Sequence, residues 1–210
     1  MSPTTPREEY AAMAARAQAL YDQGRSAREA LAECYGVELP DEIFAIADTE
    51  FDPELPDYFP VNQPWRLITG PGRGPVPSAP RTSERYEKAV ADLDPDLLPL
   101  VRLGEEETKH GDSMLCYRLS DLAQGAATVY GIEGAVWTVL EALPAEVPRY
   151  GDSLLDVLAE YYADFYAQME ERYYGPGHAV SDEMLDEARD IVAAIDRLKR
   201  DLTSGPGGQP

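Results

Sequence analysis

Apolar residues recur at steps of three and four near the start of the chain, a spacing that predicts helices. The first predicted helix covers residues 6–23. Ser26 and Glu29 form a capping-box pattern that starts a second helix, which we expect to end near Gly36. Pro40, followed by two acidic residues, opens a third, short helix. The chain therefore begins as a run of helices.

Two longer helices are predicted near the end of the chain. A Gly-Pro-Gly break at residues 175–177 separates them, and Ser181 with two acidic residues begins the second. The apolar positions of the last helix alternate by four and three, which predicts a seam that packs on another helix. We favour a partner helix in the same chain over one in a second chain. The apolar positions are Leu154, Leu158, Tyr162, Phe165, Met169 and Tyr173, then Met184, Ala188, Ile191, Ile195, Leu198 and Leu202.

The middle of the chain carries the strand signals. An apolar run predicts a strand over residues 97–103, and alternation predicts another over 114–119, with Leu115 and Tyr117 on one face and Met114 and Cys116 on the other. Two further segments, 126–130 and 135–140, flank a Gly-Ile-Glu-Gly sequence that suits a hairpin turn at 131–134. The second of these segments also fits a short helix.

Prolines dominate residues 51–80 and exclude a helix interior or a central strand over most of that stretch. Within it, residues 65–69 are the one plausible strand, and 70–80 form a loop. Residues 83–92 fit a helix again. This stretch therefore separates the first helices from the sheet.

Together these elements predict an α+β fold with a central, mostly antiparallel sheet flanked by helices and an additional long C-terminal helix. We assign residues 1–175 to a single domain that includes the N-terminal helices. Residues 176–202 form an appended helix that packs on it, and residues 203–210, rich in Gly and Pro, form a disordered tail.

The net charge of −21, from 39 acidic and 18 basic residues, narrows the classes of partner. A direct nucleic-acid binder needs a cationic surface, and so does a protein that binds anionic membranes. Cys34 and Cys116 are too few and too far apart for a disulfide framework, and we expect free thiols. Without a signal-peptide pattern or a long apolar run, we expect a cytoplasmic protein with no membrane association.

No motif supplies a clear catalytic or metal-binding group. His110 and Asp112, preceded by three glutamates, form the densest ligand-like cluster, but we interpret them as a solvated turn. Prolines in residues 70–75 remove the backbone donors that a phosphate loop needs. No Ser or Cys stands in a recognisable nucleophile motif. We therefore expect a protein without catalytic residues, metal or cofactor, and not an enzyme.

Acids, aromatics and prolines alternate over residues 50–59, in a stretch that cannot form regular structure. Aromatic side chains can anchor an interface while surrounding acids attract a cationic partner. The alternative is a loop whose Phe51 and Tyr58 pack onto the core. The candidate partner-binding residues are Glu50, Phe51, Asp52, Glu54, Asp57 and Tyr58.

Residues 33–44 (ECYGVELPDEIF) resemble the opening motif of the SUKH superfamily, which includes bacterial toxin-immunity proteins and relatives of a fungal cell-wall-assembly regulator. Residues 97–101 with 111–117 are similar to that family's central pair of strands, 129–130 to its next strand and 152–158 to its closing helix, so the resemblance covers about residues 26–166. The chain departs from the family at Asn62, which is followed by Gln-Pro where the family often has Gly, and in its last helix. The resemblance implies an α+β fold without an active site.

The resemblance and the charge together predict a binding protein that neutralises a toxin by docking an acidic face on a basic partner protein, for which a nuclease toxin is one candidate. We expect a monomer or a weak homodimer. The alternative is a regulatory or scaffold protein that acts through the seam of the last helix. An uncharacterised enzyme is the third hypothesis.

Overall fold

The computed structural model describes residues 6–48, 67–68, 90, 93–104, 108–134, 146–174 and 181–204, and it confirms the predicted α+β fold. Helices begin and end the described chain, and the strands lie between them. In chain order the elements are α1 (Pro6–Asp22), α2 (Ala27–Tyr35), α3 (Asp41–Asp48), β1 (Leu97–Leu103), β2 (Ser113–Arg118), α5 (Leu119–Leu122), β3 (Val129–Glu133), β4 (Arg149–Gly151), α6 (Leu154–Tyr174) and α7 (Asp182–Ser204).

The signals at the ends of α2 act as the sequence predicts. The Ser26 hydroxyl accepts a hydrogen bond from the Glu29 N–H, and the Glu29 carboxylate accepts one from the Ser26 N–H, which completes the capping box. Gly36 ends the helix in the left-handed conformation, with φ of 74°, which glycine adopts without steric strain.

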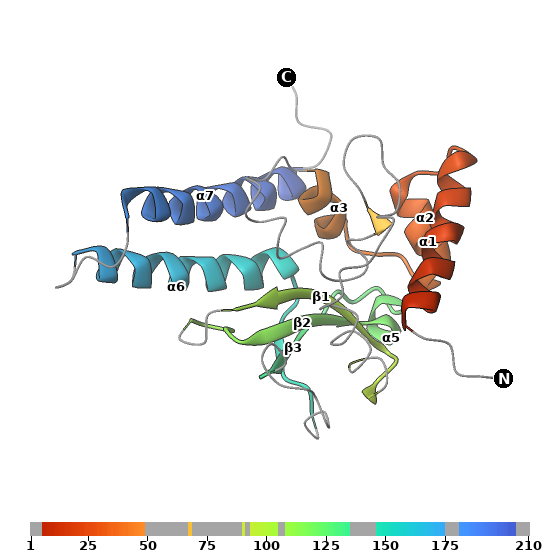
Figure 1. The fold of residues 1–210 in the computed structure, drawn as a ribbon, viewed down its shortest axis with the longest axis horizontal. Coiled ribbons are helices and arrows are strands. Elements are labelled where there is room, and N and C mark those ends of the chain that lie inside the picture. The colour runs from red at the N-terminus through yellow and green to blue at the C-terminus, as the bar shows by residue number, and fades with distance from the viewer. Residues whose placement is uncertain are drawn as a thin grey trace.

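The strands form one antiparallel sheet in the order β1-β2-β3-β4. The predicted alternation in β2 is confirmed, because Leu115 and Tyr117 belong to the large core while Met114 and Cys116 belong to a small cluster with Ile132. In Figure 1, α6 lies over the sheet and α7 lies over α6, so the two helices form successive layers on one side.

Helix α7 uses its seam within the chain. It packs antiparallel on α6 and also contacts α3 (Figure 1). Ala188, Ile195 and Leu198 are buried as the seam predicts, whereas its terminal positions, Met184 and Leu202, are exposed. Among the described residues, no helix combines the length and the apolar character needed to cross a membrane.

The predicted turn at residues 131–134 is wrong. Gly131 lies inside β3, and only Gly134, with φ of 69°, belongs to a turn. The ring of Tyr150 covers Gly131 so closely that a Cβ there would lie 2.0 Å from a ring carbon. The glycine is therefore required by side-chain packing rather than by a change of chain direction.

Three other predicted boundaries need correction. Leu119 begins α5 instead of ending β2, and its carbonyl accepts a hydrogen bond from the Ala123 N–H at 2.9 Å, as in a helical turn. Leu67 and Ile68 are buried but are not in a strand, and the Tyr21 hydroxyl donates to the Leu67 carbonyl at 2.8 Å. The last helix extends to residue 204, so residues 203–204 of the predicted tail are helical, and 205–210 lie outside the described residues.

Candidate functional site

The six predicted partner-binding residues lie outside the part of the chain that the structure describes, as does the segment 135–140. The described residues offer three other polar regions that could act as a site: a cluster around Arg118, the turn that carries His110, and the far end of the hairpin formed by α6 and α7. Their geometry distinguishes them. The six residues are Glu50, Phe51, Asp52, Glu54, Asp57 and Tyr58.

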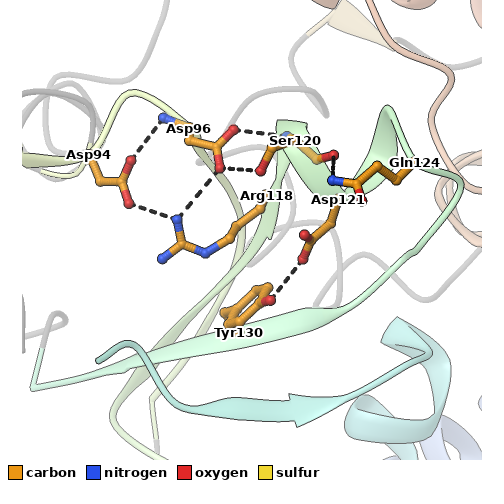
Figure 2. Close-up of polar contacts among 7 residues, drawn as sticks. All are labelled: Asp94, Asp96, Arg118, Ser120, Asp121, Gln124 and Tyr130. Atoms are coloured by element: carbon orange, nitrogen blue, oxygen red, sulfur yellow. Dashed lines mark hydrogen bonds and ion pairs between the residues drawn. The ribbon is translucent and has the colours of Figure 1, made fainter. Parts of the chain in front are cut away.

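Figure 2 shows the cluster around Arg118, at the end of β2. Its guanidinium donates to Asp94 at 2.8 Å and lies 3.5 Å from Asp96. Asp96 in turn accepts from both the N–H and the hydroxyl of Ser120, at 2.8 and 2.6 Å. The cluster joins the chain before β1 to the first turn of α5, so each of these charges already has a partner.

The pKa directions in this cluster agree with a structural role. Burial opposes ionisation of Asp96, but hydrogen bonds from Ser120 and Arg118 lower its pKa overall. The hydrogen bond from the Tyr130 hydroxyl to Asp121, at 2.7 Å, raises the pKa of Tyr130 and keeps the phenol protonated. We interpret the cluster as a clamp on the fold, because Arg118, Ser120 and Tyr130 each donate to one of its carboxylates and so give each acid a partner within the chain.

The turn that carries His110 has contacts on both of its sides. The His110 ring stacks on the Tyr150 ring, with centroids 4.3 Å apart, and its Nε2 lies 3.0 Å from a carboxylate oxygen of Glu160 on α6. The neighbouring Lys109 forms an ion pair with the same carboxylate at 2.7 Å. His110 is therefore held by packing and by an acid, and the prediction of a fully solvated turn is wrong at this residue.

No three His, Cys, Asp or Glu side chains converge to hold a metal ion within the described residues. Glu105, Glu106 and Glu107, which the sequence places next to the turn, lie outside them. Ser113 is completely buried, and its hydroxyl lies 2.9 Å from the Tyr150 hydroxyl. The described partner of the His110 Nε2 is Glu160 rather than Ser113, so the two residues do not form a nucleophile and base pair.

The far end of the hairpin has a small core of its own. Met169 of α6 and Leu185 of α7 are buried against each other, and Phe165, Tyr166 and Tyr173 pack around them. The Tyr173 hydroxyl donates to Asp182, which joins the end of α6 to the start of α7 and raises the pKa of Tyr173. In Figure 1 this end extends past the edge of the sheet. These contacts give it a defined shape beyond the main core.

We call residues 170–174 and 182–190 the acidic hairpin end. Two large apolar side chains are exposed there: Tyr174, with 74% of its surface accessible, and Met184, with 44%. They lie among seven acidic residues and two arginines. All of these charged residues except Glu187 are exposed. The acidic residues are Glu170, Glu171, Asp182, Glu183, Asp186, Glu187 and Asp190.

The helix dipoles treat these acids differently. Asp182 and Glu183 lie in the first turn of α7, where the positive end of the dipole stabilises them. Glu170 and Glu171 lie near the C-terminal end of α6, where the dipole opposes them. The contribution of Glu170 and Glu171 to helix stability is therefore unfavourable, whereas that of Asp182 and Glu183 is favourable. The hairpin end therefore has the chemistry that the sequence led us to expect at residues 50–59.

Sequence reasoning missed the hairpin end, although a signal exists in the acids on both sides of the Gly-Pro-Gly break at 175–177. That signal is weak because acids are frequent throughout the chain. No family model, curated protein or solved structure matches the chain. The function is therefore argued from the charge, the exposure and the contacts described above.

Proposed function

We propose that the protein is a non-enzymatic binding protein that docks an acidic face on a basic partner protein, and that the acidic hairpin end belongs to this face. The observation that carries the proposal is the exposure of Tyr174 and Met184 among seven acidic residues. Exposed aromatic side chains supply much of the binding energy in protein interfaces. Acids around them accelerate the approach of a cationic partner and reject anionic ones.

The class of partner follows from the resemblance of residues 33–44 and 111–117 to the SUKH superfamily. That resemblance supports an immunity protein that neutralises a toxin. A nuclease toxin has a basic cleft for nucleic acid, and an acidic face seated on that cleft would exclude its substrate. Residues 50–58 stay a predicted second part of this face.

A cytoplasmic location and a monomer or weak homodimer complete the proposal. Cys34 and Cys116 are both free thiols, which suits a reducing compartment. Helix α6 covers much of the α7 seam, so the apolar surface that the seam offers to a second chain is confined to its ends, at Met184 and Leu202.

The test is capture of partners from the source cell at low salt, followed by measurement of the dissociation constant of the captured protein at several salt concentrations. We expect a basic protein whose affinity falls steeply as salt rises. Tyr174→Ala should weaken binding by about tenfold or more, the range of an interface anchor. Glu183→Lys should weaken binding and reduce its salt dependence.

Glu38→Lys is the matched control, because Glu38 is exposed but lies between α2 and α3, away from the hairpin end. It makes the same change in net charge and should leave the affinity almost unchanged. An affinity that ignores salt would contradict the docking of opposite charges. Equal effects of Glu183→Lys and Glu38→Lys would show that the net charge, rather than this surface, governs binding.

A further inference from the structure

A hollow of about 420 Å³ lies beside the turn that carries His110. Its walls come from that turn, from the end of β3 and from β4, which the sheet brings together. The turn is pinned to β3 because the N–H of Gly134 donates to the Asp112 carbonyl at 2.8 Å. The described lining residues are Thr108, His110, Gly111, Asp112, Glu133, Gly134 and Tyr150.

Tyr150 is held in place at the hollow. One contact of its ring is with the His110 ring, and another is with the backbone of Gly131. Its hydroxyl lies 2.9 Å from the Ser113 hydroxyl and 3.4 Å from a carboxylate oxygen of Glu133. Burial raises the pKa of Tyr150, and the neighbouring Glu133 contributes to the same direction. The wall is thus preorganised, with a phenol hydroxyl beside a carboxylate.

The polar groups of this wall favour a hydrogen-bond donor with positive charge. The described lining residues include two with carboxylates, Asp112 and Glu133, and two with hydroxyl groups, Thr108 and Tyr150. Lys109, the neighbouring base, is turned to Glu160 on α6, and the His110 Nε2 contacts the same carboxylate. The described lining residues include no lysine or arginine. A group with several donors and no acceptor fits this chemistry.

We propose that this hollow receives the ammonium group of a lysine side chain on the basic partner, an inference that rests on the proposed function. An ammonium group has three donors and no acceptor, so it can use a carboxylate and hydroxyl oxygens at the same time. The turn contacts α6 at residues 160 and 164, about 15 Å along the helix from residues 170–174. A standard interface of about 800 Å² on each partner can cover both places.

The first test is an NMR titration of the full chain with N-acetyl-lysine methylamide. The norleucine analogue, which lacks the ammonium group, is the control ligand. We expect saturable shifts at the amides of Gly111, Gly134 and Tyr150 with the lysine probe at millimolar concentration, and none with the norleucine probe. Glu133→Gln should weaken binding of the lysine probe by about fivefold, as expected for an exposed charge contact that solvent partly screens. Glu183→Gln, at the hairpin end, should not change it.

Shifts that are equal for the two probes, or unchanged by Glu133→Gln, would overturn the proposal. Tyr150→Phe is a second variant, which keeps the ring packing and removes the hydroxyl. It should also weaken binding of the lysine probe.

The second test uses the captured partner. Glu133→Gln should weaken partner binding by about fivefold. The lysine probe could bind while Glu133→Gln leaves the affinity for the partner unchanged. In that case the hollow binds the ammonium group of a free amine, and a lysine of the partner is excluded. Failure of the proposed function is distinct, because it shows as unchanged partner binding in Tyr174→Ala and Glu183→Lys.

Discussion

Carboxylates lie at both ends of α6, but the helix dipole favours those at one end and opposes those at the other. At the N-terminal end, Glu42 of α3 accepts hydrogen bonds from the Leu154 N–H at 2.6 Å and the Ser153 hydroxyl at 2.5 Å. That acid meets the positive end of the helix dipole and has donors to satisfy it. At the C-terminal end, Glu170 and Glu171 meet the negative end of the dipole and are exposed.

The difference separates an acid whose hydrogen bonds join two elements of the fold from acids that lie exposed at the end of a helix. Glu42 joins elements that are far apart in sequence, and its charge is used inside the molecule. In the acidic hairpin end, the dipole of α7 stabilises Asp182 and Glu183, whereas the dipole of α6 opposes Glu170 and Glu171. We therefore expect the effect of Glu170 and Glu171 to appear in binding rather than in stability. The total charge of −21 therefore combines two populations that composition cannot separate.

The largest expected effect is at the N-terminal end of α6. Glu42→Ala should lower the free energy of unfolding by about 3 kcal/mol, because it removes two short charge-assisted hydrogen bonds of about 1.5 kcal/mol each. Chemical denaturation measures this change. Glu38→Ala, at an exposed position in the same part of the chain, should change stability by less than about 0.5 kcal/mol. Equal denaturation midpoints for Glu42→Ala and Glu38→Ala would contradict a special stabilising role for the acid at the N-terminal end of α6.

The sequence predicts the elements better than it predicts the contacts between them. Local signals, such as the capping box of Ser26 and Glu29 and the left-handed Gly36, depend only on neighbouring residues, and they are confirmed. Glu42 was assigned only to its own helix terminus, because its partners at Ser153 and Leu154 come from the far end of the chain. Gly131 was misread for the same reason, since Tyr150 gives it its role.

The chemistry expected at residues 50–59 also occurs at a second place, and the expectation for 50–59 itself stays a prediction, because those residues lie outside the described ones. Acidic residues with exposed apolar anchors were expected at residues 50–59, and the structure shows this combination at Tyr174 and Met184. Helical periodicity identifies Met184 as an apolar position and Tyr174 as the neighbour of one. It does not predict that the ends of α6 and α7 that carry these residues extend past the edge of the sheet. The hollow beside Tyr150 had no signal, because it forms where the end of β3, β4 and a turn meet.

A destabilising substitution in the acidic hairpin end should cause local unfolding, whereas one at the N-terminal end of α6 should destabilise the whole fold. Met169→Ala removes the centre of the small core and should lower the free energy of unfolding by about 2 kcal/mol, the low end of such truncations, because the site can partly collapse. Hydrogen exchange should become faster in residues 165–174 and 182–190 and stay unchanged in β2. Faster exchange throughout the sheet would show that the hairpin end is part of the global folding unit.

The buried phenol of Tyr117, near Glu42, gives a further test of the structural role that we assign to Glu42. The Tyr117 hydroxyl is buried with no hydrogen-bond partner among the described residues, and burial raises its pKa. Tyr117→Phe should therefore stabilise the protein by up to about 1 kcal/mol, measured by denaturation. A loss of stability would mean that the hydroxyl contributes to the contacts of Glu42.

The acids at the C-terminal end of α6 should show the opposite sign to Glu42. Replacing Glu170 and Glu171 together by Gln should raise stability by about 0.5 kcal/mol at low salt, because it removes charges that the dipole opposes. The gain should disappear in high salt, where exposed charges are screened. The same variant should bind the basic partner more weakly. Destabilisation at low salt would contradict the assignment of these acids to binding.

Glu160 lies between the two ends and gives the smallest effect. Hydrogen bonds from Lys109 and His110 lower the pKa of its carboxyl from the ordinary value of 4.5. A lowered pKa in the folded state contributes stability that is present above pH 4.5 and is lost as the pH falls through the folded-state value. In Glu160→Gln the free energy of unfolding should therefore decline less steeply between about pH 5 and pH 3. Identical slopes would show that the contact contributes nothing.

The contact of Glu42 with the start of α6 can form only after most of the chain has been synthesised. Glu42 and Leu154 are 112 residues apart, so α3 emerges long before its partner exists. At about 5 to 20 residues per second, a ribosome needs roughly 6 to 22 seconds to make the intervening chain. During that interval Ile43, fully buried in the finished fold, lacks the members of its core cluster that come from the later part of the chain. We therefore expect the newborn chain to expose apolar surface that the mature protein buries, and to be the more aggregation-prone of the two forms.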